Sequence, residues 1–126
     1  MVKTSQLLVL FLWVLLAAGC SSINNLTPPH QVRNPNGIYP FEVEWISRQQ
    51  ALRHDSVKAF VEIDVDSYPM QRTPLLSNRW ETLVPIPADR KHITYRYKLD
   101  YEYNSIPRPQ PDSLLSPPYQ LTIVNQ

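Results

Sequence analysis

Cysteine and glycine are scarce in this chain. The sequence of 126 residues contains one cysteine, Cys20, and two glycines, Gly19 and Gly37. A single cysteine rules out any disulfide bond within the chain. Loops that cradle phosphate groups need several glycines close together, because the backbone must approach the phosphates. These two shortages exclude a disulfide-stapled scaffold and a glycine-rich phosphate-binding loop.

An excess of charge of either sign is also missing. Lys and Arg together number 12 and Asp and Glu number 11, which gives a formal net charge of +1. Of these charged residues only Lys3 precedes Cys20, so the chain from Cys20 onward is formally neutral. Because nucleic-acid binding calls for a basic face or stripe, we expect no nucleic-acid partner.

Apolar residues with helical spacing are rare after the N-terminus, whereas proline is abundant. The chain has 13 prolines, and hardly any proline-free window repeats its apolar residues every 3.6 positions. The sequence therefore predicts an all-β fold beyond the N-terminal segment.

The N-terminus carries the pattern of an export signal. An apolar run from Leu7 to Leu16 follows Lys3 and ends in the small residues Ala17 to Gly19. This order is typical of a secretory signal, and the run is about half of the roughly 20 residues that a membrane-spanning helix needs. Residues 1–19 are therefore predicted to be a signal peptide that forms a helix.

The residues Leu16-Ala17-Ala18-Gly19-Cys20 resemble the lipobox of bacterial lipoproteins. Leu16 lies one place further from Cys20 than the usual leucine, and Ala17 stands in that slot. The resemblance implies that the Cys20 thiol is diacylated, that signal peptidase II cuts before Cys20 and that the new amine is acylated. It also implies a bacterial cell envelope location, at the outer membrane, because Ser21 and Ser22 follow Cys20 and no aspartate does. The alternative is an ordinary signal peptide that includes a cysteine by chance.

Residues 20–37 are predicted to be the lipidated N-terminus and a flexible tether. From Ser21 to Asn36 only Ile23, Leu26 and Val32 are apolar, which is too little apolar surface to offset the entropy of ordering the segment. The prolines favour an extended chain, which could hold a domain up to ~50 Å above the lipid surface.

Alternating apolar and polar positions predict strands from Ile38 onward. The clearest alternation places Val57, Ala59, Val61, Ile63 and Val65 on one face. A strand over 91–103 would be about 43 Å long, so we expect it to contain a bulge or to overhang its neighbours. The remaining strands are predicted near 38–45, 79–86 and 119–124, with a short edge strand around 70–72 and a proline-rich loop over 104–118.

The strands over 79–86 and 91–103 are predicted to form a hairpin across residues 87–90. Pairing Ile86 with Lys91 brings Glu81 opposite Arg96 and Trp80 opposite Tyr97. Apolar side chains then meet on one face and opposite charges on the other, which is the arrangement that stabilises paired strands.

Five or six strands with long loops predict an antiparallel β-sandwich over residues 38–126. The strand spacing, the tryptophan-bearing hairpin and the C-terminal closing strand resemble an immunoglobulin-like or early-set domain. The Cys…Trp…Cys core of antibody domains is absent from the sequence, which excludes that subfamily.

No residue set supports catalysis or metal binding. His54, Asp55 and Ser56 have the residue types of a hydrolase triad, but triad residues converge from different parts of a fold. Acidic residues from Glu62 to Asp66 lie ~6.5 to 7 Å apart along one strand face, too far to share a calcium ion. The three histidines have no metal-ligand spacing. We therefore expect no enzyme activity and no cofactor.

The aromatic residues allow two interpretations. Most of them lie on the predicted inward faces, which favours a core role, yet they could also form a stacking platform for sugars. Phe60 lies on a charged face, where an exposed aromatic residue would mark a binding patch. The candidate ligand-binding residues are Phe60, Trp80, Tyr101 and Tyr103.

Two functions from different classes remain. The first is a non-catalytic protein-binding or structural module, held by its lipid at the membrane and bound to another envelope protein. The second is a surface glycan-binding module. A bare sheet edge or apolar patch would favour the first, and an exposed coplanar pair of aromatic residues would favour the second.

Overall fold

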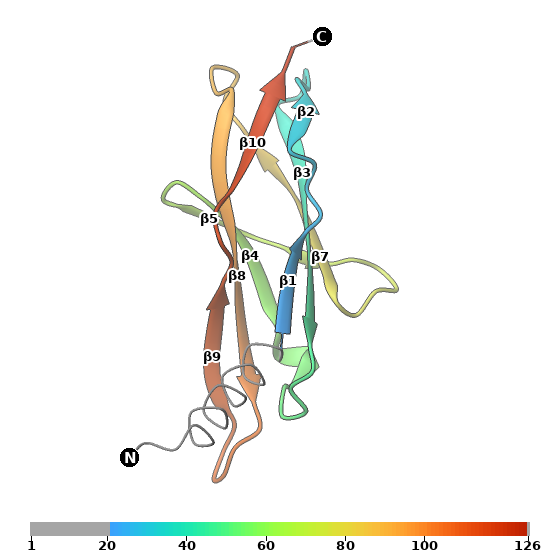
Figure 1. The fold of residues 1–126 in the computed structure, drawn as a ribbon, viewed down its shortest axis with the longest axis vertical. Coiled ribbons are helices and arrows are strands. Elements are labelled where there is room, and N and C mark those ends of the chain that lie inside the picture. The colour runs from blue at the N-terminus through green and yellow to red at the C-terminus, as the bar shows by residue number, and fades with distance from the viewer. Residues whose placement is uncertain (1–20, 126) are drawn as a thin grey trace, which may run out of the picture.

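The protein is built almost entirely from strands. The computed structural model describes residues 21–125, and over this range the only helical element is the single 3₁₀ turn η1 (Figure 1). The predicted signal peptide with its helix, and Cys20 with its predicted lipid, lie outside the described residues. In chain order the elements are β1 (Ser21–Asn25), β2 (His30–Val32), β3 (Ile38–Ser47), η1 (His54–Ser56), β4 (Lys58–Ile63), β5 (Asp66–Pro69), β6 (Gln71–Arg72), β7 (Arg79–Pro85), β8 (His92–Tyr103), β9 (Gln110–Leu115) and β10 (Tyr119–Val124).

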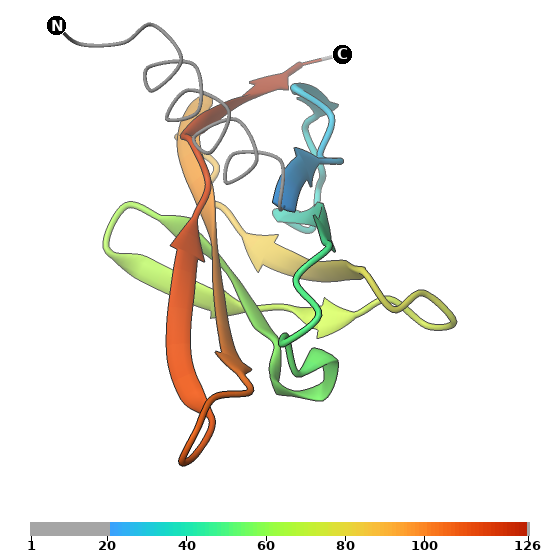
Figure 2. The ribbon, with the colours of Figure 1, turned by 60° about the horizontal axis from the view of Figure 1, so that its bottom comes forward.

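The strands form two sheets that pack face to face (Figures 1 and 2). Sheet A has four strands in the order β1-β3-β7-β6, and sheet B has the order β2-β10-β8-β4-β5 with β9 also paired to β8. All the pairs are antiparallel except β2 with β10. The predicted all-β antiparallel sandwich is thus confirmed for the described residues. None of the described helical segments is long and apolar enough to cross a membrane.

The core is formed by the inward positions of the alternating strands. In β8, for example, Ile93, Tyr95, Tyr97 and Leu99 are buried while the residues between them face solvent or the sheet surface. Aromatic rings pack edge to face across the two sheets, with the Phe41 and Tyr95 centroids 4.9 Å apart. Edge-to-face packing suits the ring quadrupoles, so these rings stabilise the contact between the sheets.

One side of the long strand β8 is paired with two different strands, one near each end. Residues 92–95 pair with β10 and residues 98–103 pair with β9, while β4 runs along the other side. Between β9 and β10, Ser116 stays bonded to β8: its hydroxyl accepts a hydrogen bond from the Tyr97 amide at 2.8 Å, and its amide donates to the Tyr97 carbonyl at 2.9 Å. The expected overhang is therefore covered by β9. The prediction that 104–118 is one loop is wrong, because this segment contains β9.

The hairpin predicted from β7 and β8 is wrong. β7 belongs to sheet A, where it pairs with β3 and β6, whereas β8 belongs to sheet B. The connection over 86–91 therefore crosses from one sheet to the other. Arg96 forms its ion pair with Glu62 at 3.0 Å, and Glu81 faces Glu42 across the β3–β7 pair. The same inward alternation that suits neighbours in one sheet also suits strands that face each other across a core.

The end of β4 also differs from the prediction. Asp64 has a positive φ of 55°, which begins a tight turn into β5, and Val65 is 97% exposed. Val65 therefore lies in a turn and not on the buried face. The short edge strand expected around 70–72 is confirmed as β6.

The prediction of a flexible tether over residues 20–37 is wrong for the part that the structure describes. β1 pairs with β3 in sheet A, and β2 pairs with β10 in sheet B, so the segment joins both sheets. The segment has few apolar side chains, but two of its polar side chains, Asn25 and Thr27, form hydrogen bonds inside the sandwich. The Tyr97 hydroxyl lies 2.6 Å from Thr27 Oγ1 and 2.7 Å from Asn25 Oδ1, and Asn25 Nδ2 donates to the Tyr95 hydroxyl at 2.8 Å.

This set of hydrogen bonds, here called the tyrosine latch, comprises Asn25, Thr27, Tyr95 and Tyr97. Thr27 is 5% exposed, and its hydroxyl oxygen also accepts from the Glu42 amide at 2.9 Å. Burial raises the pKa of the Tyr97 and Tyr95 hydroxyls above the ordinary tyrosine value, so both stay protonated and can act as donors and acceptors in the latch. The latch holds the crossing from β1 to β2 against the core.

Replacing Tyr97 by phenylalanine tests the latch. The Tyr97→Phe change removes the hydroxyl that is hydrogen-bonded to Asn25 Oδ1 and Thr27 Oγ1, and we expect it to lower the free energy of unfolding by about 1–3 kcal/mol. Urea unfolding followed by tryptophan fluorescence measures this value. The matched control is Tyr68→Phe, at a half-buried tyrosine on β5 outside the latch, which we expect to change stability by no more than ~0.5 kcal/mol. Equal effects of the two changes would show that the latch contributes nothing specific.

Candidate functional site

The four predicted ligand-binding residues are not brought together. Phe60 lies on the outer face of sheet B, directly between Pro69 of β5 and Lys98 of β8. Tyr101 and Tyr103 occupy inward positions of the same sheet, so they lie on the opposite face from Phe60. Trp80 is 3% exposed and belongs to the core. These residues therefore do not form one site.

An aromatic platform for sugars is absent from residues 21–125. Every tryptophan, tyrosine and phenylalanine in this range is buried or half-buried. The tyrosine ring of Tyr101 packs against Trp45, with the ring centroids 5.1 Å apart, and does not offer an open face beside a second exposed ring. The prediction that most aromatic residues belong to the core is confirmed for the described residues.

A small pocket of about 170 Å³ lies at one end of the sandwich, between Trp45 and Trp80. The Arg72 guanidinium lies over the Trp80 ring, 5.1 Å from its centroid. The buried indole nitrogen of Trp45, which also lines this pocket, has no hydrogen-bond partner among the described residues. Ligand pockets typically measure about 300–1,000 Å³, so this one is large enough for a single side chain at most.

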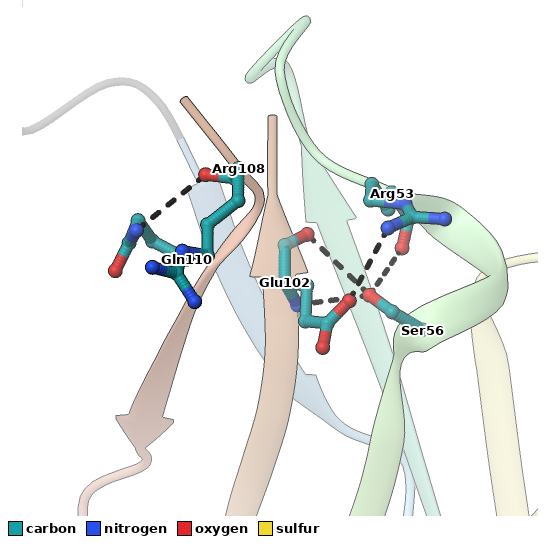
Figure 3. Close-up of polar contacts among 5 residues, drawn as sticks. All are labelled: Arg53, Ser56, Glu102, Arg108 and Gln110. Carbon is teal, nitrogen blue, oxygen red and sulfur yellow. Dashed lines mark hydrogen bonds and ion pairs between the residues drawn. The ribbon is translucent and has the colours of Figure 1, made fainter. Parts of the chain in front are cut away.

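A wider, open groove of about 650 Å³ lies between η1 and β9. One wall is organised by Ser56, whose hydroxyl donates to the Arg53 carbonyl at 2.6 Å and accepts from the Glu102 amide at 2.8 Å (Figure 3). Arg53 also forms an ion pair with the Glu102 carboxylate at 3.4 Å. At the other wall the Tyr101 hydroxyl donates to Asp112 at 3.2 Å, and burial followed by the nearby Asp112 charge raises the pKa of Tyr101.

The groove does not assemble a catalytic set. His54, Asp55 and Ser56 form one 3₁₀ turn, and the Ser56 hydroxyl is bonded to main-chain groups of Arg53 and Glu102. No hydrogen bond joins the three side chains in the structure described over 21–125, so the interpretation of this tripeptide as a turn is supported. Among the same residues, no three His, Cys, Asp or Glu side chains are grouped closely enough to hold a metal ion.

The outer face of sheet A carries an apolar surface, here called the docking face, formed by Ile38, Pro40, Leu83 and Pro85. Ile38 is directly opposite Pro85, and Pro40 is directly opposite Leu83. All four are exposed, and Leu83 is 66% exposed. Adjacent exposed apolar residues mark an interaction surface more than scattered ones do. Sequence reasoning missed these residues because it searched the outward positions only for aromatic side chains.

Sheet A is only two strands wide under the docking face. β1 pairs with β3 no further than Val43, and β6 pairs with β7 no further than Glu81. Both edges of the β3–β7 ribbon are thus uncovered by strands there, but Pro40 and Pro85 lack the amide that a new strand would need. The prolines disfavour strand addition, so a partner is expected to bind the docking face through side chains.

An acidic pair borders the docking face. Glu42 and Glu81 are directly opposite each other on β3 and β7, and neither forms an ion pair with a described residue. Like charges directly opposite each other destabilise a strand pair. In the next row Glu44 pairs with Arg79 at 3.3 Å, and the pKa of Glu44 is lowered by the hydrogen bond from Asn24 and by the hydrogen bond and charge of Arg79. The unpaired acidic pair is therefore suited to receive a cation from a partner.

Comparison with known proteins gives no assignment: no protein-family model matches the chain, and no curated protein matches it.

The Ser56→Ala change tests how the groove wall is held. Loss of the hydroxyl removes two hydrogen bonds to the main chain, so we expect the free energy of unfolding to fall by about 1–2 kcal/mol. The control is Ser113→Ala on the opposite wall, because the Ser113 hydroxyl makes no hydrogen bond with a described residue, and its effect should stay within ~0.5 kcal/mol. Denaturant unfolding of both variants measures the difference, and a Ser56→Ala variant as stable as the control would contradict the assignment.

Proposed function

We propose that this chain is a lipid-anchored lipoprotein of the bacterial cell envelope whose β-sandwich is a non-catalytic protein-binding module. The docking face is the single observation that carries the binding role, because it places four exposed apolar residues side by side on a folded sheet. The acidic pair beside it supplies charge for recognition. The groove and the small pocket supply neither a nucleophile with its base nor a group of metal ligands among the described residues.

The immunoglobulin-like type of sandwich is part of the same proposal. In such domains one sheet holds the first, second, fifth and fourth strands, and the other holds the third, sixth and seventh, with an additional edge strand in some types. Sheet A in the order β1-β3-β7-β6 and sheet B in the order β10-β8-β4-β5 match this arrangement when β1 and β2 count as one divided first strand, and β9 and β10 as one last strand. The strand order therefore supports this type without any sequence match.

The anchor rests on Cys20 and the residues before it. The lipobox-like run Leu16 to Cys20 supports acylation, and the absence of any other cysteine leaves the thiol without a disulfide partner in the chain. Two or more acyl chains hold a protein stably at a membrane, whereas one chain is marginal. Ser21 and Ser22 support the outer membrane as the destination.

Glycan binding is the weaker alternative. It would need exposed aromatic rings to stack on sugars, but every aromatic residue within 21–125 is buried or half-buried. Retardation of the protein by a purified glucan in an affinity gel would nevertheless overturn the protein-binding proposal.

The anchor is tested by the Cys20→Ser change in the full chain. Without the thiol no acyl chain can be attached, so we expect the protein to leave the membrane fraction or to accumulate with its signal peptide uncut. Density-gradient fractionation and intact mass spectrometry distinguish these products from the mature protein. A wild-type protein with an unmodified thiol at Cys20 would contradict the proposal.

The docking face is tested by site-specific photo-crosslinking in living cells. A photoreactive amino acid at the Leu83 position should yield a discrete cross-linked product, and the same amino acid at the Leu75 position should not. Leu75 is a matched control because it is a fully exposed leucine in the loop between β6 and β7, away from the docking face. Competitor proteins without the photoreactive residue are co-expressed in the same cells. Wild-type competitor should reduce the cross-linked product at least severalfold. Leu83→Asp competitor should leave it unchanged, because an aspartate in an apolar contact costs about 2 kcal/mol or more. No product at the Leu83 position, or equal products at both positions, would contradict the proposal.

A further inference from the structure

The folded N-terminal segment determines where the sandwich sits relative to the lipid. Ser21 is the first residue of β1 and pairs with Ser47 at the end of β3. Cys20 is joined to Ser21 by one peptide bond, which separates their Cα atoms by about 3.8 Å. If Cys20 is acylated as proposed above, the end of the sandwich at Ser21 and Ser47 is held at the membrane surface with no tether between them.

Two loops lie at this same end of the molecule. One is the loop over 48–53 that leaves β3, and the other is the loop over 104–109 between β8 and β9 (Figure 1). The two are joined because the Asn104 amide donates to the Ala51 carbonyl at 2.7 Å and Leu52 bridges to Tyr103. In Figure 1 the turn between β8 and β9 extends beyond the start of β1 along the long axis. The loop over 104–109 is therefore the part of the described chain that extends furthest at this end of the molecule.

The tip of this loop combines an apolar side chain with cations. Ile106 is 97% exposed, although isoleucine is usually buried. Arg108 follows two residues later (Figure 3), and Arg48 lies in the neighbouring loop. Neither arginine forms an ion pair with a described residue.

The acidic groups at this end lie behind the tip and not in it. Glu102 is paired with Arg53 at 3.4 Å, whereas Asp112 accepts a hydrogen bond from the neutral Tyr101 hydroxyl and keeps its charge. Asp112 is opposite Tyr101 in the β8–β9 pair and Asp55 lies in η1, so neither of these unpaired carboxylates is in the loop that carries Arg108. Interfacial segments place apolar side chains about 5–10 Å into the boundary between headgroups and acyl chains and place cations at the phosphates.

We infer that the sandwich rests directly on the bilayer through this end, with Ile106 inserted among the lipid headgroups and Arg48 and Arg108 at the lipid phosphates. The inference rests on the proposed acylation of Cys20. It also places the docking face, because β3 runs away from the membrane from Ser47 to Ile38. Ten residues at about 3.3 Å each place Ile38 roughly 30 Å further from the membrane than Ser47. The docking face would thus lie at a fixed distance from the membrane, and a partner would not bind at the end of a mobile tether.

The experiment uses single cysteines in the full, acylated chain. The Ile106→Cys variant and the Val65→Cys control each carry one added thiol, and Val65 matches Ile106 because both are 97% exposed and lie in turns. Val65 lies in the turn between β4 and β5, away from the end where β1 begins (Figure 1). Each protein is labelled with an environment-sensitive maleimide fluorophore and reconstituted in vesicles of phosphatidylethanolamine and phosphatidylglycerol.

Aqueous iodide and a nitroxide-bearing lipid are the two quenchers. We expect the iodide quenching constant to be at least about threefold lower for the probe at position 106 than for the probe at position 65, because a probe in the headgroup region is shielded from water. The nitroxide lipid should quench only the probe at position 106. Equal iodide quenching at both positions, with no lipid quenching at either, would overturn the inference.

The unaltered protein separates failure of this inference from failure of the proposed anchor. If Cys20 is acylated, the unaltered chain floats with the vesicles and takes up no maleimide, because it has no other thiol. Labelling of the unaltered chain would refute the anchor, and the membrane contact would fall with it. An unlabelled, floating chain whose position 106 remains open to iodide would refute the membrane contact alone.

Discussion

The tyrosine latch is the interaction on which the arrangement of this protein depends. The chain before β3 is too polar to be held by apolar burial, yet Asn25 and Thr27 reach the buried hydroxyls of Tyr95 and Tyr97. A buried hydroxyl without a partner is costly, so the two sides of the latch need each other. These hydrogen bonds stabilise the segment where the chain crosses from β1, which is paired in sheet A, to β2, which is paired in sheet B. The segment that would otherwise be a tether becomes part of the domain.

Folding of this segment shapes both ends of the molecule. At one end β1 starts directly after Cys20, so a lipid on that residue would hold the loop tip with Ile106 near the bilayer. At the other end β1 has already left sheet A, which leaves β3 and β7 as a two-stranded ribbon. Pro40 and Pro85 protect the ribbon edges against strand addition, while its outer face presents the docking face and the unpaired Glu42 and Glu81. The proposed contacts with lipid and with protein therefore lie at opposite ends of β3.

The candidate site shows where residue-by-residue reasoning reaches its limit. The aromatic residue types suit ligand binding, but Trp80 is in the core, and Phe60 and Tyr101 lie on opposite faces of sheet B. The docking face consists of aliphatic residues and prolines that look ordinary one at a time. Ile38 and Leu83 are far apart in the sequence, and only the register of β3 with β7 makes them neighbours. Their outward positions could have been found from the alternation, but their proximity could not.

The sequence by itself determined which residues of each strand face inward, because the apolar period of two is a local property of the chain. It therefore predicted the buried faces of β3, β4, β8 and β10 and the absence of long helices from residues 21–125. Only the tertiary structure decided which strands are neighbours. The apolar patterns of β7 and β8 are compatible with a hairpin and equally with two strands in facing sheets, and the structure has the second arrangement. It also decided that residues 21–32 are ordered, because the partners of Asn25 and Thr27 lie about seventy residues further along the chain. The inward and outward positions follow from consecutive residues, whereas strand pairing and the tyrosine latch depend on contacts between residues that are distant in the sequence and come together only in the folded chain.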